Sequence, residues 1–179
     1  LPDLHAQAVG LAREHLDPAP GVAVLDLYCG IGSTLRQWVQ AGASAFGVEL
    51  AGGAADCARI NAPGAVVLRG TCEQRMPQVR EWWHDGNHSR RACYVNPPRS
   101  GLEPALLEAL AHDLRPDRIA YLSCSAGTLA RDLAAFEAAG YEVSSIAPFD
   151  FFPGTHHVEC LALLTLARSL DAGEPAFND

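Results

Sequence analysis

Hydrophobic positions along the chain follow two alternating patterns. Short, nearly continuous apolar runs are typical of strands buried on both faces, and each is followed by a stretch in which apolar residues recur at helical spacing. The runs that predict strands are residues 22–28, 44–49, 65–68, 92–95, 118–123, 141–146 and 157–166. The stretches that predict helices are residues 4–16, 33–41, 51–60, 72–83, 102–114 and 128–139.

This order of elements predicts a fold class and a domain organisation. Strands that alternate with helices favour an α/β protein with a seven-stranded, mostly parallel sheet and helices on both faces. A chain of 179 residues, of which 49% are hydrophobic, has the size of a single domain. We expect a leading helix and linker over residues 1–21, a core over 22–166 and a tail over 167–179, with a polar loop at 84–91.

Composition narrows the setting in which the protein works. No apolar run has the length of a membrane span and the N-terminus lacks a secretory pattern, so we expect a cytoplasmic protein without a membrane partner. The six cysteines include no Cys-x-x-Cys pair, which predicts reduced thiols and no bound metal. A net charge of −8 disfavours a surface that gathers phosphates. The first residue is Leu1 rather than Met, which fits an excerpt of a longer protein.

A glycine turn follows the first predicted strand. In Asp26-Leu27-Tyr28-Cys29-Gly30-Ile31-Gly32, the glycines let the backbone approach a ligand closely. Glu49 ends the next strand, where a carboxylate can accept hydrogen bonds from both ribose hydroxyls of an adenosine ligand. Each feature alone also fits a tight turn or a surface carboxylate, but the pair favours a nucleotide-like ligand. Leu35 replaces the third glycine of a dinucleotide fingerprint, which weakens a hydride-transfer function.

Two candidate reactive groups follow later strands. Cys124 comes directly after strand 118–123, at the sheet edge where open α/β folds bind ligands, so its thiolate is a candidate nucleophile. Glu159 begins an otherwise apolar strand, where burial would raise the pKa of its carboxyl towards that of a general base. The structural alternatives are a buried cysteine and a salt bridge from Glu159 to Arg131.

A turn with two further polar side chains ends strand 92–95. In Asn96-Pro97-Pro98-Arg99 the prolines fix the turn, so that the Asn96 side chain can bond a planar polar group and Arg99 can contact a phosphate or a carboxylate. An ordinary loop turn is the alternative for both.

Four blocks of the sequence together resemble the RNA uridine-5-methyltransferase family. The blocks are Asp26-Leu27-Tyr28-Cys29-Gly30-Ile31-Gly32, Asn96-Pro97-Pro98-Arg99-Ser100-Gly101, Ser123-Cys124-Ser125 with Thr128-Leu129-Ala130-Arg131-Asp132-Leu133, and Phe152-Pro153-Gly154-Thr155-His156-His157-Val158-Glu159. The resemblance covers residues 22–166, and the last two blocks are the most specific. It implies a Rossmann-like class I methyltransferase fold and S-adenosyl-L-methionine as cofactor.

The resemblance also implies roles for single residues. Cys124 would add to C6 of a uracil, C5 would take the methyl group, and Glu159 would remove the C5 proton. The implied cofactor-binding residues are Asp26, Tyr28, Gly30, Gly32, Glu49, Thr71 and Asn96. Arg99 and Asn96 would contact the substrate, a uridine of tRNA or rRNA that leaves its stack to enter the site.

The sequence departs from the family pattern at several places. Asn96 stands where the family usually has Asp, and Thr71 stands where an acidic or amide residue commonly holds the adenine amino group. The family's N-terminal RNA-binding domain and iron–sulfur cysteine cluster have no counterpart here. Two alternatives therefore stay open: an N-methyltransferase that uses the Asn96-Pro97-Pro98 turn, and a degenerate paralogue that binds the cofactor or a partner without catalysis.

Overall fold

A computed structural model describes residues 2–151, 153–154 and 158–167. Its strands are β1 (Val22–Leu27), β2 (Ser44–Glu49), β3 (Val66–Arg69), β4 (Arg90–Val95), β5 (Arg118–Ser123), β6 (Tyr141–Phe149) and β7 (Glu159–Leu166). Its helices are α1 (Pro2–Leu16), α2 (Ser33–Gln40), α3 (Gly52–Asn61), α4 (Cys72–Asp85), α5 (Pro104–Glu108), the π-helix η1 (Ala109–Leu114) and α6 (Ala126–Ala138).

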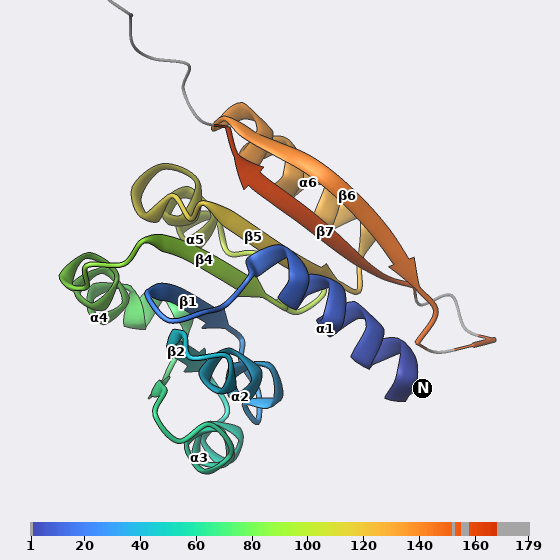
Figure 1. The fold of residues 1–179 in the computed structure, drawn as a ribbon. Coiled ribbons are helices and arrows are strands. Elements are labelled where there is room, and N and C mark those ends of the chain that lie inside the picture. The colour runs from blue at the N-terminus through green and yellow to red at the C-terminus, as the bar shows by residue number, and fades with distance from the viewer. Residues whose placement is uncertain (1, 152, 155–157, 168–179) are drawn as a thin grey trace, which may run out of the picture.

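The strands of the described residues form one twisted sheet (Figure 1). Their order is β3-β2-β1-β4-β5-β7-β6, and every neighbouring pair from β3 to β5 is parallel. Strand β7 runs antiparallel to both β5 and β6. The predicted mostly parallel, seven-stranded sheet is confirmed.

Helices cover both faces of the sheet, because side chains alternate along each strand. On β4, Ala92 and Tyr94 pack in the core beneath α1, α2 and α3, whereas Cys93 and Val95 pack in the core beneath α4, α5–η1 and α6. Figure 1 shows the two helical layers with the sheet between them. The carboxyl ends of β1 to β5 therefore meet at one edge, between the two layers.

The predicted loop at 84–91 is wrong at both ends. Helix α4 continues to Asp85 and β4 begins at Arg90. Partners distant in the sequence explain this difference: Arg90 donates to Asp17 at 2.8 Å, and the backbone N–H of Arg91 donates to the Asp117 carboxylate at 2.8 Å. A local polar pattern contains no information on such partners.

Other boundaries differ by smaller amounts. The predicted helix 102–114 begins at Pro104 and changes to π-helical geometry at Ala109. Strand β6 extends beyond residue 146 to Phe149 and is irregular between Val143 and Ser145. The last strand begins at Glu159; His157 and the tail from 168 lie outside the described residues. No helix in the described ranges is long and apolar enough to span a bilayer.

Two fully buried carboxylates tie the elements to the sheet. Asp26 on β1 accepts hydrogen bonds from Thr34 and Trp38 of α2, both at 2.7 Å. Asp132 of α6 accepts from the Tyr121 hydroxyl on β5 at 2.7 Å and from the backbone N–H of Leu102 at 3.0 Å. Buried acceptors of this kind are stable only when donors reach them, so they fix how each helix sits on the sheet.

The Asp26 carboxyl makes folding depend on pH. Burial raises its pKa from 3.8 to about 7, against the opposing effect of the Thr34 and Trp38 hydrogen bonds. Above about pH 4 the unfolded chain ionises at this position while the folded chain stays neutral until about pH 7, so stability is lost across that window as the pH rises.

We therefore expect Asp26→Asn, which keeps an acceptor oxygen and cannot ionise, to gain stability relative to wild type by a few kcal/mol between pH 4.5 and pH 8. Urea unfolding of both proteins at the two pH values measures this difference, with the exposed Asp85→Asn as control. A stability difference between Asp26→Asn and wild type that is equal at both pH values would contradict the prediction.

Candidate active site

The turn after β1 has a backbone that only glycine adopts easily. Gly30 and Gly32 have φ values of 55° and 81°, and the non-glycine Tyr28 between strand and turn also has a positive φ of 61°. A Cβ on Gly32 would lie 2.9 Å from the Cα of Ala58 on α3. The glycine therefore permits the close packing of this turn against α3, and the strained Tyr28 is the kind of backbone found at functional sites.

Glu49 is held in place by two backbone donors. Its Oε2 accepts a hydrogen bond from the N–H of Gly30 at 2.9 Å, and its Oε1 accepts from the N–H of Ala51 at 2.8 Å. An ionised carboxylate has about four acceptor positions, so each oxygen retains capacity for a hydroxyl. The glycine turn and the end of β2 thus form one preorganised acceptor.

A cavity of about 250 Å³ opens beside this carboxylate. Its walls come from the carboxyl ends of β1 to β4 and the loops after them. The lining residues are Tyr28, Val48, Glu49, Leu50, Gly70, Thr71, Cys72, Pro98 and Glu103. Since pockets for whole drug-sized ligands are roughly 300–1,000 Å³, this one suits a part of a larger ligand, such as a nucleoside.

The predicted cofactor residues have different places around this cavity. Tyr28, Glu49 and Thr71 line it, and Gly30 supports Glu49. Asp26 has an exposed fraction of 0% and bonds to α2, so its placement favours a supporting role beneath the turn over the direct contact expected from the sequence. Asn96 is exposed directly after β4, and its backbone N–H donates to the Leu27 carbonyl at 3.4 Å.

The lining residues that were not predicted as site residues include Leu50, Cys72 and Glu103. Leu50 carries a usable signal, because a large apolar residue directly after Glu49 is 63% exposed at the ligand edge of the sheet. Cys72 begins α4, and burial together with the nearby Glu103 charge raises the pKa of its thiol to about 12. Glu103 has no signal in sequence, because it enters the cavity from a later loop.

The two predicted catalytic residues lie at the same end of the paired strands β5 and β7. Ser123 pairs with Cys160 at the end of the antiparallel β5–β7 ladder; Cys124 is the first residue after β5, and Glu159 is the first residue of β7. Side chains alternate along β7: Leu161 packs beneath α1–α3, and Glu159 lies two residues before it on the same strand. We infer that the Glu159 side chain projects to the α1–α3 side of the sheet.

The Glu159 carboxyl interacts electrostatically with Arg99, in the turn of residues 96–99. Partial burial raises the pKa of the Glu159 carboxyl, and the positive charge of Arg99 partly offsets this rise. Burial raises the pKa of the Tyr94 hydroxyl on β4, and the charges of Asp26 and Glu159 raise it further. The Glu159 carboxylate therefore lies within electrostatic reach of the carboxyl end of β4 and of the turn that follows it.

The loop after Arg99 is fastened to α6 by several hydrogen bonds. The Thr128 hydroxyl donates to the Arg99 carbonyl at 3.1 Å, and Arg131 donates to the carbonyls of Ser100 at 3.1 Å and Leu102 at 3.3 Å. Arg131 also pairs with Asp132 at 2.6 Å, so the predicted alternative of an Arg131–Glu159 bridge is not the pairing formed. These contacts explain why the Thr128–Leu133 segment accompanies Cys124 in the sequence.

Cys124 differs in its surroundings from several other cysteines. Cys29, Cys72 and Cys93 are buried, and burial raises the pKa of each thiol. Cys124 is half-buried at the start of the loop before α6. In the described part of the chain no three possible metal-ligating side chains gather.

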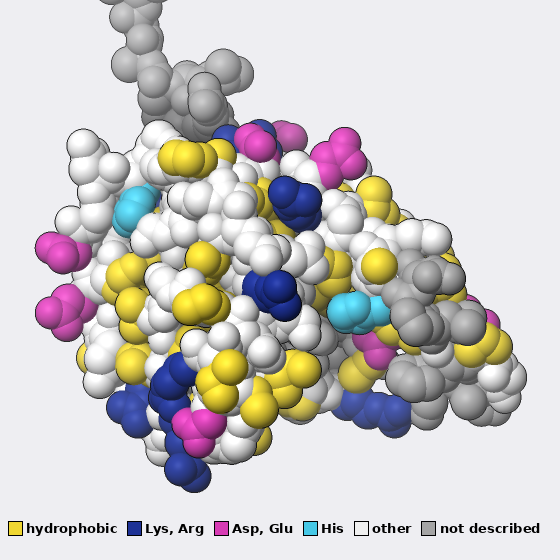
Figure 2. Space-filling view, turned by 60° about the horizontal axis from the view of Figure 1, so that its bottom comes forward, with side chains coloured by type: hydrophobic (Ala, Val, Ile, Leu, Met, Phe, Trp, Pro, Cys, Tyr) yellow, Lys and Arg dark blue, Asp and Glu magenta, His cyan; other side chains and the backbone are white. Residues whose placement is uncertain are grey.

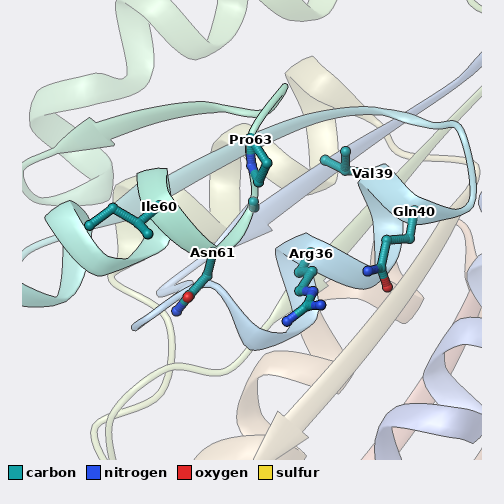
Figure 3. Close-up of a pocket in the computed structure, with 7 residues that line it drawn as sticks. Arg36, Val39, Gln40, Ile60, Asn61 and Pro63 are labelled. Carbon is teal, nitrogen blue, oxygen red and sulfur yellow. The ribbon is translucent and has the colours of Figure 1, made fainter.

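A larger surface hollow lies elsewhere, between α2 and α3 (Figure 3). Arg36 and Gln40 line it from α2, and Ile60 and Asn61 line it from the end of α3. None of the predicted site residues lines this hollow. It is separate from the cavity beside Glu49.

Surface charge is mixed on the face that Figure 2 shows. Arg side chains gather at its lower left beside an acidic side chain and elsewhere stand singly. This distribution agrees with the net charge of −8.

Comparisons with known proteins show which family the chain resembles. The sequence profile described as tRNA (Uracil-5-)-methyltransferase matches residues 84–167, which include the Asn96, Cys124 and Glu159 motifs. An uncharacterised RNA methyltransferase of Oceanobacillus iheyensis is 38% identical over 151 residues, covering 82% of this chain and 32% of the relative. The chain thus spans about a third of the length of the curated relatives it matches.

Solved structures give the same result. The tRNA (uracil-54, C5)-methyltransferase of Pyrococcus abyssi, solved with S-adenosyl-L-homocysteine, is 31% identical with a TM-score of 0.68, covering 89% of this chain and 38% of that one. A precorrin-6y C5,15-methyltransferase of Geobacter metallireducens shares the fold, with 12% identity, a TM-score of 0.67 and coverage of 88% and 86%. These likenesses confirm the class I methyltransferase fold. In sequence, residues 84–167 match the tRNA (uracil-5-)-methyltransferase family model, and in fold most of the chain is similar to a part of a tRNA (uracil-54, C5)-methyltransferase.

Proposed function

We propose that this chain is the catalytic domain of an S-adenosyl-L-methionine-dependent enzyme that methylates C5 of a uridine in tRNA or rRNA. Cys124 is the nucleophile and Glu159 is the base. The observation that supports the proposal is the antiparallel β5–β7 register, in which Ser123 pairs with Cys160, so that the adjacent residues Cys124 and Glu159 lie at the same end of the two strands. The reaction needs a nucleophile and a proton acceptor beside the same uracil ring, and the neighbouring strands β5 and β7 carry the two candidates to the same edge of the sheet.

The residues at the carboxyl ends of β1 to β3 fit the cofactor. Glu49 would accept from the ribose hydroxyls, the turn at Gly30 and Gly32 would lie along the amino-acid part, and Tyr28 and Thr71 would border the adenosine. The exposed Leu50 would pack on the adenine face. When bound, the cofactor supplies an electrophilic methyl group. Asn96 follows β4, the strand between β1 and β5 in the sheet, so it is a candidate contact for either ligand.

The chain's own residues would carry the remaining chemistry. Uracil C5 is a poor nucleophile until a thiolate adds to C6, so Cys124 forms a bond to C6 and electron density moves to C5. After C5 accepts the methyl group, Glu159 removes the C5 proton. The C5 electron pair then reforms the C5–C6 double bond, the sulfur–C6 bond breaks, and the Cys124 thiolate is regenerated. The raised pKa of Glu159 suits a group that must take up a proton.

Arg99 and Asn96 would hold the flipped uridine. The Asn96 amide can bond a uracil edge but cannot take a proton at neutral pH, so we assign it no acid–base role. Arg99 lies within electrostatic reach of Glu159 and can contact a phosphate or a uracil carbonyl.

RNA binding would depend largely on other parts of the protein. A net charge of −8 gives little non-specific attraction to phosphates. The aligned residues make up about a third of the relatives' length, which leaves room for a separate RNA-binding segment. A cytoplasmic RNA substrate fits this assignment.

Loss of the nucleophile tests the proposal most simply. We expect Cys124→Ala to lower methyl transfer to transcribed tRNA and rRNA by more than about a thousand-fold, because the unactivated C5 does not react. Radiolabelled methyl transfer and nucleoside mass spectrometry measure the product as 5-methyluridine. The exposed Cys57→Ala is the matched control and should keep full activity.

Retained activity in Cys124→Ala, or a product methylated on nitrogen, would contradict the proposal in favour of an N-methyltransferase. Absence of transfer to either RNA class by the full-length wild-type protein, with S-adenosyl-L-methionine bound, would favour the degenerate paralogue.

Removal of the base should stop the reaction after methylation. With Glu159→Gln we expect turnover to fall by about 10²–10⁴-fold and a denaturation-resistant protein–RNA adduct to accumulate on ordinary uridine, because the C5 proton stays in place. Gel electrophoresis after denaturation detects the adduct, and the exposed Glu142→Gln serves as control. Fast turnover without an adduct would show that another group takes the proton.

Cofactor affinity should depend on the Glu49 charge. Glu49→Gln weakens the bonds to the ribose and loses one backbone donor contact, so we expect binding of S-adenosyl-L-homocysteine to fall roughly 10- to 100-fold. Titration calorimetry measures this loss, with the exposed Glu137→Gln as control. Equal affinities for the Glu49→Gln variant and wild type would place the ribose elsewhere.

A further inference from the structure

The cavity beside Glu49 contains a second carboxylate, that of Glu103. Glu103 lies in the loop between β4 and α5, far along the chain from the glycine turn. No motif of the sequence resemblance includes it. Its surroundings indicate what it binds.

Glu103 does not serve the helix that it precedes. It occupies the N-cap position of α5, yet its side chain makes no capping hydrogen bond. The residues that cap helix N-termini well are Asp, Asn, Ser and Thr, whose short side chains reach the first backbone N–H groups. The longer Glu side chain does so less easily. The carboxylate instead accepts a hydrogen bond from the hydroxyl of Tyr28, across the cavity wall.

The position of Glu103 within the cavity follows from its neighbours. Its charge, after burial, is the main cause that raises the pKa of the Cys72 thiol. Cys72 directly follows Thr71, so Glu103 faces the β3–α4 side of the cavity. Glu49 is anchored separately, to Gly30 and Ala51.

Thr71 is poorly placed to replace a missing acidic residue. Its hydroxyl oxygen accepts the backbone N–H of Gln74 at 3.1 Å, and Gln74 accepts the N–H of Thr71 at 3.2 Å. This capping box engages the side chain at the start of α4. As an acceptor for an adenine amino group, a neutral hydroxyl is also much weaker than a carboxylate.

An adenosine has donors at two separated points, the ribose hydroxyls and the exocyclic amino group. The cavity has two carboxylates held by different elements. With Glu49 on the ribose, the other donor remains for Glu103, one oxygen of which is bonded to Tyr28 while the carboxylate retains further acceptor positions.

We propose that Glu103 is a specificity-determining residue that accepts a hydrogen bond from the adenine amino group and so performs the task that Thr71 does not. The proposal rests on the proposed function, because it requires an adenosine-containing cofactor in this cavity. Tyr28 is the positioning residue that orients the carboxylate. A base with a carbonyl at the same place would be disfavoured by the repulsion between two acceptors.

Titration calorimetry with two ligands tests this role. S-adenosylhomocysteine carries the amino group, and S-inosylhomocysteine carries a carbonyl in its place. We expect wild type to prefer the adenosyl ligand by roughly 10- to 100-fold, the range for a hydrogen bond to a charged acceptor. Glu103→Ala should reduce this preference to within about threefold, and Tyr28→Phe should reduce it partly. The exposed Glu108→Ala, on α5 itself, should leave it intact.

Glu103→Gln gives a second, conservative readout. Its amide can accept from Tyr28 and turn an N–H towards the base, so the preference should fall or invert in favour of the inosyl ligand. A wild-type preference that is absent, or one that Glu103→Ala and Glu103→Gln leave unchanged in folded protein, would overturn the proposal while the proposed function stands. Failure of wild type to bind either ligand would overturn both.

Discussion

The antiparallel pairing of β7 with β5 is the constraint on which the candidate active site depends. The other pairs from β3 to β5 are parallel, and parallel strands bring only their carboxyl ends to the ligand edge. A reversed strand brings its beginning to the same edge. Glu159 therefore begins β7 at the edge where Cys124 follows β5.

Buried carboxylates convert this sheet geometry into a fixed site. Asp132 bonds to the Tyr121 hydroxyl and to the backbone of Leu102, so α6 and the loop after Arg99 cannot move independently of β5. Asp26 performs a similar task between β1 and α2. Each is stable only with its donors in place, so packing of the helices and formation of the ligand edge depend on each other.

The sequence predicts the elements well where the signal is local. Apolar runs predict the buried strands, and glycines at 30 and 32 predict the turn, because burial and backbone geometry act within a few residues. The loop at 84–91 fails because Arg90 and Arg91 are paired with Asp17 and Asp117, which no local pattern contains. The site divides in the same way: Cys124 and Glu159 belong to sequence motifs, whereas Glu103 lines the cavity from a later loop and accepts a hydrogen bond from Tyr28, which no local pattern contains. The buried position of Asp26 was likewise not visible, since a motif does not distinguish a ligand contact from a support beneath it.

The claim that Cys124 and Glu159 face each other across two strands has a direct structural test. Directly opposed residues of antiparallel strands have Cα atoms about 4.5–5.5 Å apart, within the range that a disulfide bridges. Mild oxidation of folded Glu159→Cys, followed by peptide mass spectrometry, should show a bond between positions 124 and 159 in most molecules. If the new cysteine instead stays reduced or pairs with the exposed Cys57, the two catalytic positions do not converge and the account is contradicted.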